Sequence, residues 1–174
     1  FLKVGIGYRV LGGTKFYERA EIKDAVSYLR IIYQKYDDLA LERVIGVPKK
    51  GVGDSTLNQI YLFGKKFELC LEDSINKMIE KNLLKPKIKT SLANLIQMIN
   101  KWRTDMKKIK HYDLLKLVLD ESGYSELLKN KKDLENENRL ENIKELLNAM
   151  KEFDNLESFL EHVALATSID QDWE

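Results

Sequence analysis

Apolar side chains recur at helical spacing along most of the chain. Intervals of three or four residues place them on one face of an α-helix, which can then pack against a core. The clearest stripe consists of Leu92, Leu95, Ile96, Ile99 and Trp102. Besides the helix that carries this stripe, the pattern predicts helices over residues 21–35, 38–45, 69–84, 113–119, 138–153 and 156–166.

Residues suited to helix ends define the limits of one further helix and the start of the helix that carries the stripe. Asp54 or Ser55 is expected to cap the start of one, because a short polar side chain accepts hydrogen bonds from free N–H groups. Gly64 is expected to end that helix. Pro86 interrupts the next periodic stretch, so the helix that carries the stripe is expected to begin at positions 90–91, a Thr-Ser pair.

The first segment follows a different pattern. Val4, Ile6, Tyr8 and Val10 alternate with glycine or arginine, and two glycines follow at positions 12–13. A period of two predicts a short β-strand that leads into a turn. The expected fold class is therefore mainly α, an irregular multi-helix domain with a short N-terminal strand.

Composition narrows the class of protein. The chain has 174 residues, enough for one domain with a core, and it is 44% hydrophobic and 33% charged. No apolar run approaches the roughly 20 residues that a membrane span needs, so we expect no membrane partner. The single cysteine, Cys70, cannot form an internal disulfide, which fits a cytoplasmic location. The net charge is +1, so any contact with nucleic acid must come from local features.

Charge is distributed unevenly along this nearly neutral chain. Lysine and arginine residues between positions 81 and 110 are opposed by Asp105 alone, whereas acidic residues dominate positions 133–157. Two interpretations of the basic stretch stay open. It is either a solvated helix surface or a secondary surface for nucleic acid or a partner.

The most informative local feature is the turn at residues 49–56, Lys-Lys-Gly-Val-Gly-Asp-Ser-Thr. Two glycines around an apolar residue permit a tight turn and a close approach of a ligand to the backbone. The helix that follows presents unpaired N–H groups and a partial positive charge, which suits a phosphate. The residues expected to contact DNA here are Lys49, Lys50, Gly51, Val52, Gly53, Ser55 and Thr56. This is the arrangement of a helix-hairpin-helix on a DNA backbone, and an ordinary interhelical turn is the alternative.

No motif for catalysis or nucleotide binding accompanies the turn. The segment Gly12-Gly13-Thr14-Lys15 lacks the Gly-x-x-x-x-Gly-Lys-Ser/Thr spacing of a P-loop, which occurs nowhere in the sequence. His111 and His162 have no metal-ligand spacing, so we interpret them as structural or surface residues. We expect no catalytic residue, metal site or bound cofactor in this chain.

The segments that carry a family pattern are Tyr8-Arg9-Val10-Leu11-Gly12-Gly13-Thr14-Lys15-Phe16-Tyr17-Glu18-Arg19, Glu21-Ile22-Lys23-Asp24-Ala25 with Tyr28-Leu29-Arg30, Leu41-Glu42-Arg43-Val44-Ile45, Val47-Pro48-Lys49-Lys50-Gly51-Val52-Gly53-Asp54-Ser55-Thr56-Leu57, Arg139-Leu140-Glu141-Asn142-Ile143-Lys144-Glu145-Leu146 and Phe159-Leu160-Glu161-His162-Val163-Ala164-Leu165. Together these segments resemble the UvrD/PcrA/Rep helicases. They span nearly the whole chain in the family's order, although residues 69–131 match weakly. Gly7 stands where the family usually has proline, and Val52 where isoleucine is commoner.

The resemblance implies a division into three parts. Residues 1–13 are expected to be a remnant of the RecA-like motor domain 2A, residues 14–168 the helical accessory domain 2B, and residues 169–174 the start of the return to 2A. The absence of an initial methionine and of an evident terminating device fits a piece of a longer protein.

The resemblance also implies a function. The whole protein would be an ATP-dependent 3′–5′ DNA helicase, using ATP and Mg²⁺ outside this chain, with DNA repair or replication as its setting. This chain would grip duplex DNA at a single/double-strand junction, contact domain 2A and regulate unwinding. Carried over by position, its duplex contacts fall on Lys23 and on the turn. By itself this piece is expected to be inactive as an ATPase.

Two other readings remain open. The chain could be a free-standing DNA-binding module, against which the strand-like first segment and the missing methionine argue. It could also be a helical protein-interaction module without DNA binding, for which the acidic residues 133–157 would serve. A steep dependence of DNA affinity on salt separates this second reading from the DNA-binding ones.

Overall fold

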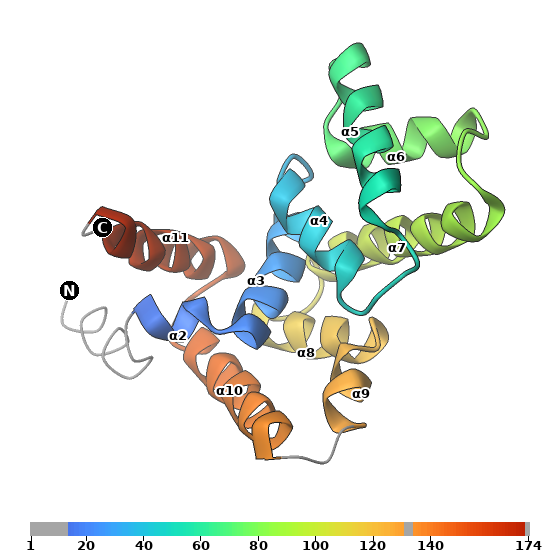
Figure 1. The fold of residues 1–174 in the computed structure, drawn as a ribbon. Helices are drawn as coiled ribbons and strands as arrows, with labels where there is room; N and C mark the ends of the chain where they lie inside the picture. The colour runs from blue at the N-terminus through green and yellow to red at the C-terminus, as the bar shows by residue number, and fades with distance from the viewer. Residues whose placement is uncertain (1–13, 131–133, 173–174) are drawn as a thin grey trace.

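The computed structural model describes residues 14–130 and 134–172, with side chains described for 15–130 and 134–168. This part of the chain folds into ten α-helices and contains no strand (Figure 1). The helices are α2 (Thr14–Glu18), α3 (Ala20–Tyr33), α4 (Asp38–Gly46), α5 (Asp54–Phe67), α6 (Leu71–Glu80), α7 (Pro86–Asp105), α8 (His111–Glu121), α9 (Tyr124–Lys129), α10 (Leu134–Met150) and α11 (Leu156–Asp172). The mainly helical class is thus confirmed, whereas the expected strand lies outside the described residues.

Helix α3 forms the centre of the fold. It packs against α2, α4, α7, α8, α10 and α11, and nine of its 14 residues are buried. A helix that is buried on nearly all sides needs apolar residues around its circumference, which the run from Val26 to Ile32 supplies. Even its buried acids have partners, since Glu21 accepts a hydrogen bond from Asn142 on α10 at 2.6 Å.

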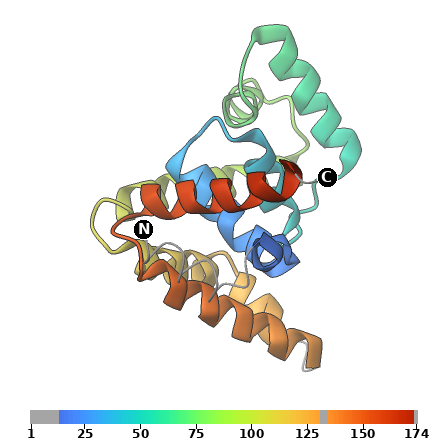
Figure 2. The same cartoon turned by 90° about the vertical axis from the view of Figure 1, so that its left-hand side faces the viewer.

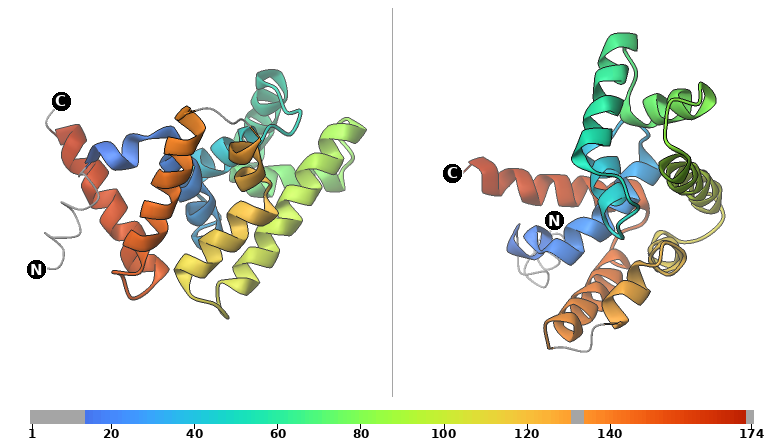
Figure 3. Two further views of the ribbon diagram at one scale, coloured as in Figure 1. Left: turned by 90° about the horizontal axis from the view of Figure 1, so that it is seen from below. Right: turned by 45° about the vertical axis from the view of Figure 1, so that its right-hand side comes forward.

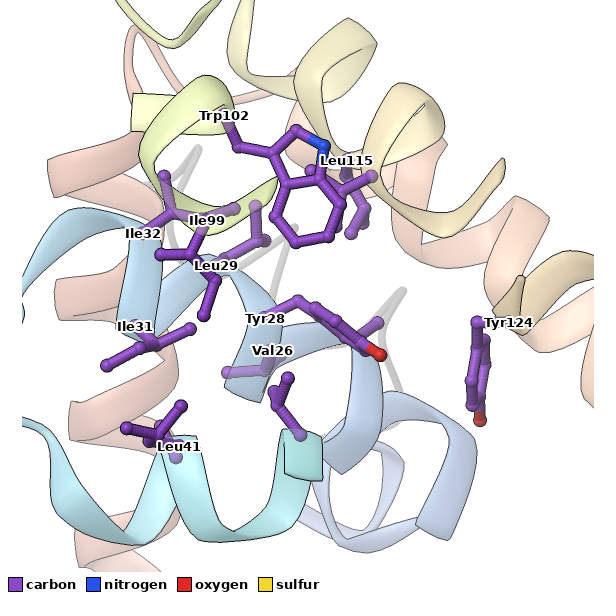
Figure 4. Packing of buried hydrophobic residues seen from close by; sticks show 14 of the residues in the cluster. Val26, Tyr28, Leu29, Ile31, Ile32, Leu41, Ile99, Trp102, Leu115 and Tyr124 are labelled. Carbon is purple, nitrogen blue, oxygen red and sulfur yellow. The ribbon is translucent and has the colours of Figure 1, made fainter. Parts of the chain in front are cut away.

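The core around α3 is filled by aromatic and branched side chains (Figure 4). Trp102 on α7 and Tyr28 on α3 are both fully buried, and their rings meet edge to face at 5.9 Å. The indole Nε1 of Trp102 donates to Glu121 on α8 at 2.9 Å, which satisfies its only polar group. Leu29, Ile99 and related side chains complete the packing, so the stripe predicted on α7 does face the core.

The remaining helices surround this centre in two groups. Helices α2, α10 and α11 lie on one side of α3, and α11 crosses that side beside α2 (Figures 1 and 2). Helices α5 and α6 pack against each other and project from the other helices, as Figure 3 shows from two further directions. None of the described helices is long and apolar enough to cross a lipid bilayer.

Three predicted helix ends are wrong. Pro86 begins α7 rather than breaking it, because proline at the first helical position lacks only an N–H that has no partner there. Thr90 accordingly lies within the helix, and its hydroxyl donates to the Pro86 carbonyl at 3.0 Å. Gly64 does not end α5, which continues to Phe67 and turns at Glu68 with a φ of 55°. The N-cap of α5 is Gly53, one residue before the predicted pair.

Other boundaries differ by a few residues. The helix predicted over 69–84 is α6, which begins at Leu71 after Cys70 acts as N-cap and ends at Glu80. The short helices α2 and α9 were not predicted, because five or six residues are too few to display a helical period. Helix α11 runs to Asp172, beyond the predicted end at residue 166. The proposed domain limits stay predictions.

Candidate nucleic-acid interface

The turn between α4 and α5 begins at a backbone carbonyl that the core holds in place. Helix α4 ends at Gly46, and Val47 follows as its C-cap and precedes a cis peptide bond to Pro48. The hydroxyl of Tyr28, on the central helix, donates to the carbonyl of Val47 at 2.8 Å. The start of the turn is therefore fixed to the most buried helix of the fold.

Lys50 closes the end of α4. Its ammonium donates to the carbonyl of Val44 at 2.8 Å and to that of Pro48 at 2.6 Å. The Val44 carbonyl also accepts the N–H of Val47 at 3.4 Å, so Lys50 adds a second donor at the end of the helix. Burial lowers the pKa of Lys50 to about 8. An ammonium has three N–H donors, and two of them have acceptors here. Lys50 therefore shapes the turn, while its contact with DNA stays a prediction.

The two glycines of the turn differ in whether the backbone conformation requires glycine. Gly51 has a φ of +76°, a conformation that other L-residues rarely adopt, so the backbone itself requires glycine. Gly53 has a φ of −90° and a ψ of 177°, which any residue adopts. A Cβ added to Gly53 would meet no atom within 4 Å. Nothing inside the described chain explains glycine at position 53, and its α-carbon lies open to an external molecule.

The first turn of α5 presents donors beside Gly53. The first hydrogen bond into the helix runs from the N–H of Leu57 to the carbonyl of Gly53 at 3.0 Å, and no side chain caps the residues before it. The N–H groups of Asp54, Ser55 and Thr56 are thus available to an acceptor. Gly53, Asp54 and Ser55 are exposed, and Thr56 is half-buried.

Charge at this helix start is mixed. Lys49 is exposed and adds a positive charge, whereas the exposed Asp54 adds a negative one in the first turn of α5. Asp54 stabilises the helix through the macrodipole and opposes an anion at the same place. Affinity for a phosphate would therefore rest on the backbone N–H groups and hydroxyls more than on net charge.

Lys23 lies on another element, near the start of α3, and is exposed. Arg43, on the last turns of α4, pairs with Asp24 at 2.7 Å and donates to the carbonyl of Ala20 at 3.3 Å. This places the end of α4, and hence the beginning of the turn, beside the start of α3. Among the described contacts, no hydrogen bond or ion pair joins Lys23 to residues 49–56.

The supporting contacts of the turn were missed by the sequence argument. Asp24, besides pairing with Arg43, accepts a hydrogen bond from the hydroxyl of Tyr124 on α9 at 2.7 Å, which also joins α3 to α9. Tyr28 was given no structural role by the sequence argument. These partners are 19 or more residues apart in the chain, so helical periodicity carries no signal for them.

Comparison with known sequences identifies proteins that this chain resembles. The model of the UvrD-like helicase C-terminal domain family matches residues 1–174. The chain belongs to this family. A probable DNA helicase II homolog of Rickettsia felis is 36% identical over 165 residues, covering 95% of this chain and 25% of the relative. The ATP-dependent DNA helicase PcrA of Staphylococcus aureus is 33% identical over 179 residues, covering 98% of this chain and 24% of the relative.

This UvrD-like C-terminal domain sequence therefore spans about a quarter of the length of these relatives. The resemblance to UvrD/PcrA helicases is confirmed at the level of this family. The finer assignments, to the 2B domain and to residues that contact DNA, stay predictions.

The basic stretch of this UvrD-like domain divides into paired and unpaired residues. Lys101 pairs with Asp105 and Glu121 at 2.8 Å, and Arg103 pairs with Glu72 at 2.6 Å. These two cations hold helices together. Lys81, Lys85 and Lys87 are exposed and form no ion pair with other described residues. Among all the residues that the structure describes, no group of three or more His, Cys, Asp or Glu side chains is placed to hold a metal ion.

Proposed function

We propose that this chain is the accessory 2B domain of an ATP-dependent 3′–5′ DNA helicase, and that it grips the backbone of duplex DNA ahead of the fork. The relatives named as DNA helicases support the class of the whole protein. ATP and Mg²⁺ are assigned to other parts of that protein, because the P-loop pattern does not occur in this chain. In this role the domain also contacts motor domain 2A and regulates unwinding in DNA repair or replication.

One observation carries the DNA-binding part of the proposal: Gly53 is a glycine that its own backbone does not require. Its φ of −90° suits any residue, and the space beside its α-carbon is open. A missing side chain at an uncapped helix start lets a phosphate reach the N–H groups of the first turn. The absence of a base-reading side chain at this point fits a contact that holds DNA without reading its sequence.

The other predicted residues would assist this contact. The hydroxyls of Ser55 and Thr56 can donate to the same or the adjacent phosphate, and Lys49 adds a mobile positive charge. Gly51 and Lys50 keep the turn in shape, through a left-handed backbone and two carbonyl contacts respectively. Lys23, on the neighbouring α3, would reach a phosphate farther along the strand.

The substitution Gly53→Asp tests the proposal without unfolding the domain. Aspartate is a favourable N-cap, so its carboxylate would accept the N–H groups of the first turn and stabilise α5. It would also exclude a phosphate from these donors. A hydrogen bond to a charged group contributes about 1.5–3 kcal/mol, so we expect duplex affinity, measured by fluorescence anisotropy, to fall at least about tenfold. Adding Thr56→Ala should weaken it further.

Two control variants separate charge from geometry. Gly53→Asn occupies the same N–H groups without a charge and should weaken binding by a smaller factor. Asn58→Asp adds one negative charge on the exposed second turn of α5 and should change affinity little. Unchanged duplex binding by Gly53→Asp, in a domain with undiminished thermal stability, would remove the turn from the interface.

A further inference from the structure

A second surface with features of a nucleic-acid site lies at the opposite end of α5. The side chain of Phe67, in the last position of this helix, is exposed, with 48% of the residue accessible to solvent. Its ring lies 4.7 Å from that of Phe63, one turn earlier. One side of the Phe67 ring is thus supported by an aromatic neighbour while much of the ring remains in water.

Two lysines from different helices flank this ring. The ammonium of Lys66 lies 5.4 Å from the ring centroid of Phe67, and that of Lys81, just after α6, lies 5.8 Å from it. Both distances fall within cation–π range. We call Phe63, Phe67, Lys66 and Lys81 the Phe67 surface.

The packing of α5 on α6 shapes a hollow beside these residues. The hollow has a volume of about 410 Å³ and is lined by Phe63, Phe67, Leu69 and Lys81, among others. Gly64 allows the two helices to approach, because a Cβ there would lie 2.5 Å from Ser74 Oγ and 2.9 Å from the Leu69 carbonyl. The hollow is therefore formed by the close packing of α5 on α6.

The charges around the hollow are predominantly positive after internal pairs are removed. Asp73 is paired with Lys35 at 2.8 Å, and Glu80 lies 3.7 Å from Lys77. Lysines 65, 66, 81, 85 and 87 are exposed and form no ion pair within the described part of the chain. Glu68 is the exposed acid that remains among them.

We propose that the Phe67 surface binds single-stranded nucleic acid by stacking an unpaired base on Phe67 and contacting adjacent phosphates through Lys66 and Lys81. An exposed aromatic face beside flexible cations is the combination that binds single strands without sequence preference. The bases of a duplex interior are covered by their neighbours, so only an unpaired or terminal base can stack on this ring. The positive charge favours a polyanion over an apolar protein segment.

This surface is separate from the turn and does not depend on it. Helix α5 has 14 residues, which at 1.5 Å each place its two ends about 20 Å apart. The turn at its start presents backbone N–H groups to a phosphate, whereas the Phe67 surface presents a ring to a base. A covalently closed circular duplex, which has no terminal base, therefore probes the first site, and a single strand probes the second.

The first experiment measures binding of a fluorescein-labelled oligothymidylate of about ten nucleotides, a length within the site sizes of single-strand binders. Loss of one stacked base weakens binding by about 5- to 150-fold, so Phe67→Ala should lower affinity by a factor in that range. Phe67→Tyr should retain affinity, and Phe67→Leu, which keeps apolar bulk without a π-face, should not. Binding of the closed circular duplex should be unchanged in all three variants.

The second experiment detects the stacking itself. Phe67→Trp places an indole at the surface, and its fluorescence should be quenched when oligothymidylate binds. Trp102 is fully buried, and the unsubstituted chain, which also contains Trp173, supplies the background signal. A merely electrostatic contact would not produce this quenching.

The third experiment counts phosphates. The combined variant Lys66→Gln and Lys81→Gln should reduce the slope of log affinity against log salt by about 1.4, at about 0.7 for each lost contact to a single strand. The matched control is Lys116→Gln with Lys129→Gln, two exposed lysines on other helices, which should leave the slope unchanged.

Two outcomes would overturn the proposal. Equal oligothymidylate binding by Phe67→Ala and the unsubstituted chain would show that no base stacks there. If Phe67→Ala instead abolished a self-association seen by sedimentation and left oligothymidylate binding intact, the surface would be a protein contact.

Discussion

A single side chain, Lys50, connects the shape of the turn to pH. Its ammonium is partly buried against two carbonyls, and burial lowers its pKa from 10.5 to about 8. Below pH 8 Lys50 keeps its proton in both the folded and the unfolded chain, so it contributes no pH dependence to the free energy of unfolding in that range. Between pH 8 and 10.5 the unfolded chain holds more of the proton than the folded chain, so the free energy of unfolding rises with pH.

We expect this rise to be about 1 kcal/mol between pH 7 and about 9.5, less than the full pKa shift implies because solvent screens a partly exposed group. The measurement is urea unfolding of the unsubstituted chain and of Lys50→Met at both pH values. Lys50→Met should lack the rise, while Lys49→Met, at the exposed neighbouring position, should keep it. Burial raises the pKa of the Cys70 thiol above its usual range, and Cys70 is common to all three proteins, so the comparison removes its effect.

At the scale of elements, the pairing of α5 with α6 depends on one missing side chain. Gly64 is buried inside α5, facing Ser74 of α6, whose hydroxyl donates to the Cys70 carbonyl at 2.8 Å. Leu69, just past the end of α5, closes the helix by donating from its N–H to the Gly64 carbonyl at 2.8 Å. The sharp reversal of the chain between the two helices therefore requires close approach at residue 64.

We expect Gly64→Ala to destabilise the chain by about 1–3 kcal/mol, because the added methyl group overlaps a backbone oxygen and a buried hydroxyl. Gly46→Ala is the matched control, since a Cβ at Gly46 meets nothing within 4 Å. In that position alanine should be neutral or stabilising by up to about 1 kcal/mol, as helix propensity predicts. Chemical denaturation of both variants measures the difference. Equal effects at the two glycines would mean that α6 moves away at little cost.

Sequence periodicity located the long helices because each buries an apolar stripe over several turns. It failed where one residue type has two meanings. Proline both breaks helices and begins them, as Pro86 does, and glycine both ends helices and permits close packing, as Gly64 does. Only the neighbouring helix distinguishes the two cases, and a sequence read by itself does not contain that neighbour.

At the scale of the whole molecule, Arg103 joins three helices. Its guanidinium forms two hydrogen bonds to the buried carboxylate of Glu72 on α6, at 2.6 and 2.8 Å. It also donates to the carbonyls of Ile31 and Ile32 at the end of α3, at 2.8 and 3.4 Å, and to Asn100 at 3.0 Å. These contacts use all five N–H donors of the group and attach the α5–α6 pair to the centre of the fold.

Arg103→Met should destabilise the chain by about 3–5 kcal/mol, because it leaves the buried Glu72 carboxylate without a cation. Arg103→Lys should cost less but remain destabilising, since an ammonium cannot reproduce the two-pronged contact. Lys101→Met, which removes the exposed pairs with Asp105 and Glu121, should cost at most about 1 kcal/mol. Thermal unfolding of the three variants measures the order. In a double-mutant cycle, Glu72→Gln should relieve part of the Arg103→Met penalty.

The candidate site was predictable from sequence only in part. A Gly-x-Gly pattern before a helix, with lysines before and hydroxyls after it, is local and readable. Lys50 donates to a carbonyl at the end of α4 because the backbone turns back there. Arg103, in the basic stretch, pairs with Glu72, which lies 31 positions away in the chain. Neither contact is visible in the local sequence pattern. The structure thus separates cations that stabilise the fold from exposed cations that form no ion pair among the described residues.

The two contacts proposed at the ends of helix α5 would have a consequence for the kinetics of holding a strand. A rigid rod of about 20 Å fixes the spacing between its two ends, which corresponds to about six base steps. With a weak contact at each end, release of one leaves the other attached, and the freed end rebinds at a high local concentration. Such a rod would shift along a strand without full dissociation. Lengthening α5 by one turn would change the distance between the two contacts, and hence the length of each shift, while each contact kept its own strength.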